Sequence, residues 1–105
     1  MAQRPRIETD PLGHRIILEG IDLSASAQFA EPEEILAQVI RKPAMLIEIN
    51  GSAGHRLYFF RSVDWSHTLL VGAELRNDEW RTFSYVQNPA SAELSELLKQ
   101  GRQLI

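Results

Sequence analysis

Residues 44–87 read AMLIEINGSAGHRLYFFRSVDWSHTLLVGAELRNDEWRTFSYVQ, and this stretch decides the fold that the sequence predicts. It divides into four segments rich in β-branched and aromatic residues, which favour strands: residues 44–50, 55–63, 68–75 and 79–87. The connections between them are short and contain Gly, Ser, Asn or Asp, as turns do. Short connections join antiparallel neighbours, because a parallel return needs a long crossover. The stretch therefore predicts a four-stranded antiparallel meander.

Two segments outside the strand block carry helical patterns. Residues 32–42 start with a proline and two glutamates, place apolar residues on one stripe and stop before Pro43. Residues 91–100 carry a leucine stripe and end at Gly101. We expect both helices to pack on the sheet.

The first thirty residues are less regular. Residues 15–18 (RIIL) can form a short first strand, and residues 1–9 are expected to be flexible. Residues 23–29 are ambiguous, with Asp22 or Ser24 as the cap of a short helix there. The predicted fold class is α+β, with a four-stranded antiparallel meander packed against an N-terminal helical segment and a C-terminal helix. At 105 residues we expect a single domain spanning residues 1–105.

Composition excludes several classes of protein. The apolar share of 44% is that of a globular chain, which argues against global disorder. The chain has no cysteine, so disulfides and thiolate metal sites are excluded. No apolar run reaches the length of about 20 residues that a membrane span needs, and MAQRPRIETD is not followed by the apolar region of a signal peptide. We therefore expect a cytoplasmic protein without membrane contact.

The predicted sheet has two faces of mixed character. Side chains along a strand alternate between faces, which places Phe83 and Tyr85 with Arg81, and Thr82 and Ser84 on the other side. Neither face is purely apolar, so the face away from the helices must expose Arg, His, Ser and Thr. Such a face is either an ordinary solvated surface or a polar binding surface, and the sequence leaves both interpretations open.

The three histidines, His14, His55 and His67, do not follow the spacing of a metal site. We predict neither a metal nor a cofactor. A histidine near an Arg-rich face can act as a general acid or base, because imidazole titrates near neutral pH. His55 is the best placed, at the start of a strand. The GSAG segment at residues 51–54 lacks the form of a phosphate-binding loop and fits a hairpin turn.

The remaining polar and aromatic candidates suit RNA cleavage without a metal. In that reaction the 2′-hydroxyl of RNA attacks the adjacent phosphate, so the protein needs to supply only positive charge and an acid and a base. The sequence places suitable side chains on the predicted sheet: Arg56, Tyr58, Arg61, Arg76, Arg81, Thr82, Ser84 and Tyr85. The net charge of −3 does not indicate a nucleic-acid-binding protein by itself.

The order of elements and several short motifs resemble a known group of proteins. DPLG (10–13), PEEILAQVIRKPAMLIEI (32–49), HRLYFFRSVD (55–64), LLVGAEL and the segment from Trp80 to Ile105 are similar to the phage-associated branch of the barnase–EndoU–colicin–RelE-like (BECR) fold of metal-free ribonucleases. The likeness spans about residues 10–105. It implies an α+β ribonuclease or toxin domain of phage or prophage origin.

The resemblance also implies roles for individual residues. It points to Arg56 and Arg61 as phosphate-binding groups and to Thr82 and Ser84 as polar groups of the last strand. Many members carry a histidine in the first helical segment, and residues 21–42 contain none. Either His55 or His14 takes its place, or the domain is not catalytic.

We therefore expect a small metal-independent endoribonuclease or toxin-like domain that acts on RNA. The predicted catalytic residues are His55, Arg61, Thr82 and Ser84, and the predicted substrate-binding residues are Arg56, Tyr58, Arg81 and Tyr85. The alternative is a non-catalytic binding or structural module on the same fold. It would engage a protein partner, such as an immunity protein or a phage structural protein.

Overall fold

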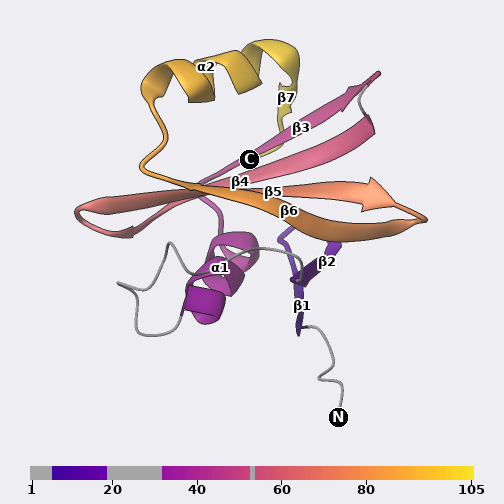
Figure 1. The fold of residues 1–105 in the computed structure, drawn as a ribbon, viewed down its shortest axis with the longest axis horizontal. Helices are drawn as coiled ribbons and strands as arrows, with labels where there is room; N and C mark the ends of the chain where they lie inside the picture. The colour runs from indigo at the N-terminus through magenta and orange to yellow at the C-terminus, as the bar shows by residue number, and fades with distance from the viewer. Residues whose placement is uncertain (1–5, 19–31, 53) are drawn as a thin grey trace.

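The computed structural model describes residues 6–18, 32–52 and 54–105, which form one sheet with a helix on each side (Figure 1). In chain order the elements are β1 (Arg6–Thr9), β2 (Arg15–Leu18), α1 (Pro32–Arg41), β3 (Met45–Gly51), β4 (Gly54–Asp64), β5 (His67–Arg76), β6 (Glu79–Gln87), α2 (Ser91–Gln100) and β7 (Arg102–Gln103). In space the strands follow the order β1-β2-β6-β5-β4-β3-β7. No helix in the described part of the chain is long and apolar enough to cross a membrane.

The predicted four-stranded antiparallel meander is wrong as a description of this sheet. Its four strands are present as β3 to β6 and pair antiparallel in chain order. The sheet, however, has seven strands and is mixed, because β2 lies parallel to β6, with Ile16 beside Trp80 and Ile17 beside Arg81. Hydrogen bonds with β6 hold β2 in place, and pairing between segments so far apart in sequence leaves no local sequence pattern.

The start of the described chain also differs from the prediction. Residues 6–9, expected to be flexible, form β1 and pair antiparallel with β2. The described chain thus opens with a strand hairpin and not with a helical segment, and the helix expected at residues 23–29 lies outside the described residues. The segment RIET is a weak strand by itself, and pairing with β2 gives its backbone groups their partners. At the other end β7, too short to leave a pattern, pairs with β3.

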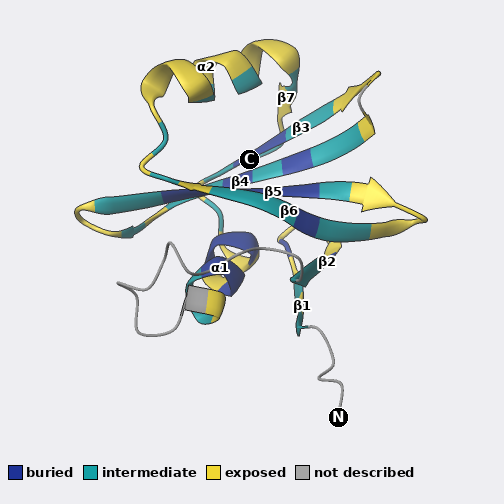
Figure 2. Cartoon of the chain, in the orientation of Figure 1, coloured by how far each residue is buried: buried dark blue, intermediate teal, exposed yellow. Residues whose placement is uncertain are grey.

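The hydrophobic core lies between α1 and one face of the sheet (Figure 2). Three α1 side chains, Leu36, Val39 and Ile40, are buried against the sheet residues Leu57 and Phe59. Their spacing puts them on one side of the helix, as the sequence pattern predicts. The centre of this face, called the α1 face below, is therefore buried from solvent.

A bulge in β6 changes which side chains share a face. Gly72 pairs with Ser84 and Ala73 pairs with Thr82, so Phe83 is an extra residue in β6. Strict alternation fails at this point, and the expectation that Arg81 and Tyr85 share a face is wrong. Tyr85 packs against the core on the α1 face, whereas Arg81 pairs with Glu74 on the opposite face.

The opposite face is covered less completely. Helix α2 crosses it and contacts β3 and β7, yet none of the ten residues of α2 is buried. Gly101 ends the helix and sets its distance from the sheet. A Cβ atom at this position would overlap the backbone carbonyl oxygen of Glu48 and lie 2.7 Å from a side-chain carbon of Ile49.

We predict that Gly101→Ala destabilises the protein by about 1–3 kcal/mol, the usual cost of an overpacked position. The added methyl group meets backbone, so α2 and β7 must move away from β3. The measurement is the free energy of unfolding by chemical denaturation. Gly51→Ala is the matched control, because a Cβ atom at Gly51 has no neighbour within 4 Å among the described residues. Equal stability of the two variants would contradict the close packing of α2 on β3.

Candidate active site

Two histidines from distant parts of the sequence meet at the same tryptophan. The ring of His14 lies 5.6 Å from the ring of Trp80, and the ring of His55 lies 4.9 Å from it, both edge to face. His14 precedes β2, His55 lies near the start of β4, and Trp80 lies near the start of β6. Trp80 is only half-buried, so the two imidazoles contact an indole ring that solvent can reach.

His14 is oriented by a buried carboxylate. Asp10 Oδ2 lies 2.8 Å from His14 Nδ1, and the Asp10 side chain is fully buried. Its Oδ1 accepts the backbone N–H groups of Leu12 and His14 at 3.0 and 2.8 Å, which closes the turn DPLG. An ionised carboxylate only accepts hydrogen bonds, so the proton of a neutral His14 sits on Nδ1. The other nitrogen, Nε2, is left for a substrate.

His55 is oriented by a second carboxylate. Its Nε2 lies 2.9 Å from Glu48 Oε2, and Arg102 Nη2 lies 3.0 Å from Glu48 Oε1. The hydrogen bond from His55 and the charges of His55 and Arg102 hold the pKa of the Glu48 carboxyl below its usual range, against partial burial, which raises it. By the argument used for His14, the proton of a neutral His55 sits on Nε2 and leaves Nδ1 open.

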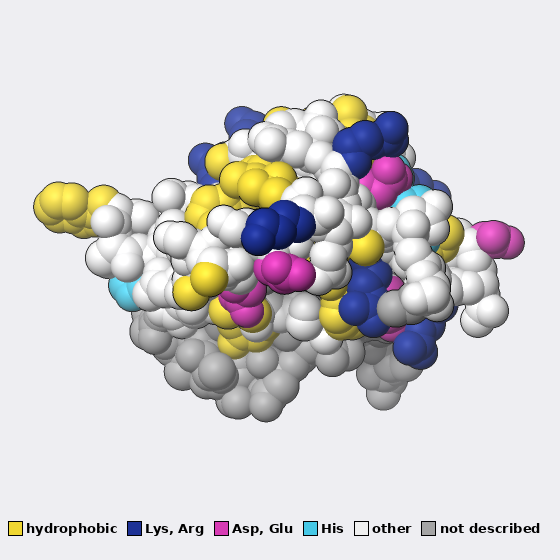
Figure 3. Space-filling view, turned by 90° about the horizontal axis from the view of Figure 1, so that it is seen from above, with side chains coloured by type: hydrophobic (Ala, Val, Ile, Leu, Met, Phe, Trp, Pro, Cys, Tyr) yellow, Lys and Arg dark blue, Asp and Glu magenta, His cyan; other side chains and the backbone are white. Residues whose placement is uncertain are grey.

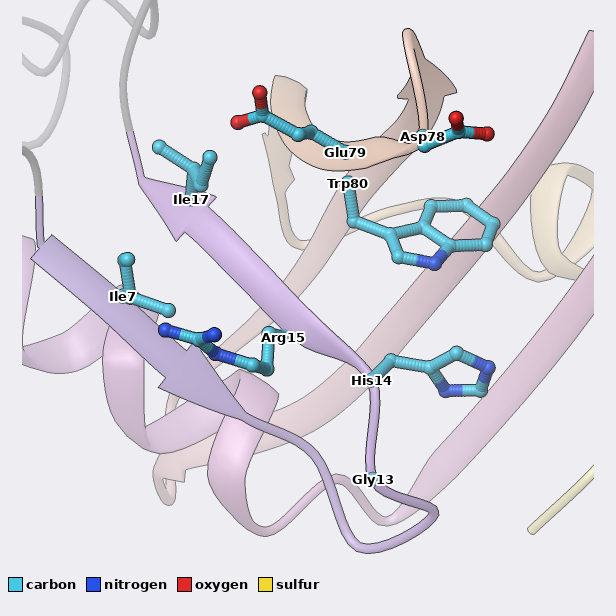
Figure 4. A pocket seen from close by; sticks show the side chains of 8 residues that line it. All are labelled: Ile7, Gly13, His14, Arg15, Ile17, Asp78, Glu79 and Trp80. Atoms are coloured by element: carbon cyan, nitrogen blue, oxygen red, sulfur yellow. The ribbon is translucent and has the colours of Figure 1, made fainter.

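A cavity of about 530 Å³ opens beside His14 and Trp80 (Figure 4). The side chains of these two residues point to the same side, whereas Arg15 points away from them, toward Ile7. Asp78 of the β5–β6 turn and Glu79, the first residue of β6, also line the cavity, together with Ile7, Gly13, Arg15 and Ile17. Two basic residues belong to these surroundings: Arg15, which lines the cavity, and Arg102, which contacts Glu48, the partner of His55.

The structure separates the other predicted catalytic residues from His55. Arg61 lies on the same face, but about 20 Å further along β4 at the rise of a strand, and donates a hydrogen bond to the carbonyl oxygen of Lys42. Thr82 is buried and donates to the carbonyl oxygen of Ile17 at 3.4 Å. Ser84 pairs with Gly72 and lies on the opposite face.

Three of the four predicted substrate-binding residues, Arg56, Tyr58 and Arg81, lie on the face that α2 crosses, and Tyr85 packs on the core. Arg56 and Tyr58 come together around the ring of Phe83. Among the eight predicted site residues, His55 packs its ring edge to face on Trp80.

Sequence reasoning missed the partners that give the histidines their orientation. Glu48 could have been found from the hairpin register, since it pairs with Leu57 and so lies diagonal to His55. Asp10 carried a weaker signal, a turn that begins with Asp and ends at a histidine. Trp80 meets His14 through the parallel β2–β6 pair, which no local pattern indicates. Among the described residues, no group of three His, Asp or Glu side chains is arranged to hold a metal ion.

Comparisons with models of protein families, with curated proteins and with solved structures gave no match to this chain. The two histidine–carboxylate pairs around Trp80 therefore carry the functional argument.

The lowered pKa of Glu48 predicts how stability depends on pH. A carboxyl with a pKa below its usual value of 4.5 stabilises the folded state above that pH, and this contribution is lost as the pH falls through the folded-state pKa. Glu48→Gln should be less stable than the original chain above about pH 5, and the difference should shrink in more acidic solution. Unfolding measured between neutral and acidic pH tests this. Glu93→Gln, exposed on α2, should show no comparable pH-dependent difference.

Proposed function

We propose that the chain is a metal-independent endoribonuclease that uses His14 and His55 as its acid and base. The observation that carries the proposal is the contact of both imidazoles with Trp80, each imidazole held by its own carboxylate. Paired histidines suit proton transfer near neutral pH, because one can be protonated while the other is neutral. The resemblance to BECR ribonucleases supports the same class of reaction.

The chemistry needs two proton transfers. One imidazole takes the proton of a ribose 2′-hydroxyl while the oxygen of that hydroxyl attacks the adjacent phosphorus. The other gives a proton to the departing 5′-oxygen, which leaves a 2′,3′-cyclic phosphate. The open nitrogens are His14 Nε2 and His55 Nδ1 under the proton placements above. The half-buried ring of Trp80, which both imidazoles contact, offers a surface on which a base can stack.

Positive charge at the phosphate comes from the protonated imidazole, with smaller contributions from Arg15, which lines the cavity, and Arg102. Four carboxylates, Asp10, Glu48, Asp78 and Glu79, lie in or beside the site and outnumber these two arginines. This balance fits a substrate held mainly by stacking, with few phosphate contacts, and so predicts a weak dependence of affinity on salt.

A protein-binding module is the second candidate function. Trp65 is fully exposed at the turn between β4 and β5, and Val86 and Leu98 are exposed on the side of the sheet that α2 crosses. Figure 3, seen from the side of α2, shows apolar side chains gathered near the centre of this view with charged ones around them. Exposed apolar surface of this kind is found at protein interfaces.

The test is cleavage of RNA in the presence of EDTA. His14→Asn and His55→Asn should each lower the cleavage rate about 10²–10⁴-fold, the usual contribution of a general acid or base. His67→Asn is the matched control, because His67 is also paired with a carboxylate, Asp64, at 2.9 Å, but in the β4–β5 turn away from Trp80. Folded protein that fails to cleave RNA at any pH would overturn the proposal and leave the protein-binding module.

The pH dependence of the rate separates one active histidine from two. Two histidines with opposite protonation states predict a bell-shaped profile whose limbs belong to the pair. His14→Asn and His55→Asn should each remove one limb from the profile of their residual activity. A profile with a single limb in the original chain would contradict a paired mechanism. A control with Glu93→Gln should keep both limbs.

A further inference from the structure

Arg56 stands out on the face opposite to the histidines. Its side chain is half-buried, yet it makes no hydrogen bond and no ion pair with any residue that the structure describes. Its Nε is cut off from solvent and is the single buried side-chain nitrogen or oxygen of the described chain without a partner. Buried polar atoms almost always have a hydrogen-bond partner, so an exception calls for an explanation.

The guanidinium group of Arg56 is held in place by aromatic rings. Its central carbon lies 4.8 Å from the centre of the Phe83 ring, which is a cation–π contact. Phe83 lies edge to face with Tyr58 at 6.1 Å, and its ring sits over Gly72, where a Cβ atom would approach it to 2.8 Å. The β6 bulge and the lack of a side chain at Gly72 thus make room for the Phe83 ring, on which Arg56 packs.

The carboxylate across the strand ladder from Arg56 is paired with another arginine. Glu74 pairs with Arg56 across the β4–β5 ladder, but its Oε1 lies 2.7 Å from Arg76 Nε. Arg56 instead lines a cavity of about 280 Å³ with Tyr58, Ser52 and Gln100, next to Ile49 and the β3–β4 turn. The cavity thus joins one cation without an ionic partner, neutral hydrogen-bonding groups and an apolar side chain.

We propose that this cavity binds a small organic carboxylate, with Arg56 as its ionic partner. A guanidinium group fixed by one face on a ring presents its N–H groups along its edge, which matches the planar geometry of a carboxylate. A single charge suits the site better than two, because Arg56 is one cation with Glu74 as its neighbour across the ladder. Ile49 and Tyr58 provide contact for a short apolar body.

The site does not depend on ribonuclease activity. Arg56 and Tyr58 extend from the face of β4 opposite to His55, so the sheet itself separates the cavity from the two histidines. The proposed carboxylate site on the face beneath α2 is therefore separate from the site of the two histidines.

The test is a titration followed by ¹H–¹⁵N NMR, observing the Arg56 Nε–H signal and the backbone amides of Gly51 and Gly54. Butyrate should shift these signals to saturation with a dissociation constant on the order of 1–10 mM, as expected for a ligand with so few atoms. Butyramide, which has the same shape without the charge, should give no saturable shift. Inorganic phosphate should bind at least about fivefold more weakly than butyrate, since it carries more charge into a site with one cation.

Variants connect the binding to Arg56. Arg56→Gln should weaken butyrate binding about tenfold or more, and Arg56→Lys should weaken it less, because lysine keeps the charge and loses the planar fork. Lys99→Gln, next to the lining residue Gln100 but outside the cavity lining, should bind as the original chain does. If Arg56→Gln does not fold, the comparison of butyrate binding by Arg56→Lys and by Lys99→Gln decides whether Arg56 is the binding group.

Three results would overturn the proposal. One is the absence of saturable shifts with butyrate. Another is equal binding of butyrate by the original chain and both Arg56 variants. Tighter binding of phosphate than of butyrate would overturn the assignment to carboxylates in favour of a phosphate ligand.

Discussion

The packing of α1 on the centre of the sheet is the interaction on which the rest of the structure depends. This helix has ten residues, and its side chains Leu36, Val39 and Ile40 are buried against the middle of β4 and β5. A helix of this length is about 15 Å long, so it covers only part of a sheet whose strands reach eleven residues. The ends of the α1 face are left for side chains that remain in contact with solvent.

Both histidine–carboxylate pairs lie where that cover stops. His55 and Glu48 extend from β4 and β3 near their shared turn, and Trp80 extends from β6 beside the next turn. Asp10 and His14 come from the β1–β2 turn, which reaches Trp80 because β2 pairs with β6. On the other face, α2 lies over the sheet without burying any of its own residues, and that looser cover leaves room for the cavity beside Arg56.

Local features of the chain were predictable, and distant pairings were not. Short turns specify the hairpins, so β3 to β6 follow from the sequence, and apolar stripes locate α1 and α2. The parallel pair of β2 and β6 rests on contacts between residues more than sixty positions apart, for which a single sequence gives no signal. The bulge at Phe83 had a second effect, because one extra residue reverses the faces of everything after it. The bulge separates Ser84 from Thr82 and Tyr85 from Arg81, which strict alternation places together. It does not affect β4, where Arg56 lies opposite to His55, and Arg61 shares the face of His55 further along the strand.

The two edge strands of the sheet are the first and last strands of the described chain, β1 and β7. Each is only a few residues long, which limits the row of unpaired backbone groups that another molecule could extend. Removal of β7 would uncover the seven-residue β3, and removal of β1 together with β2 would uncover the nine-residue β6. Trimmed forms of the protein would then present open strands for edge-to-edge association, so the intact end segments protect the molecule against aggregation.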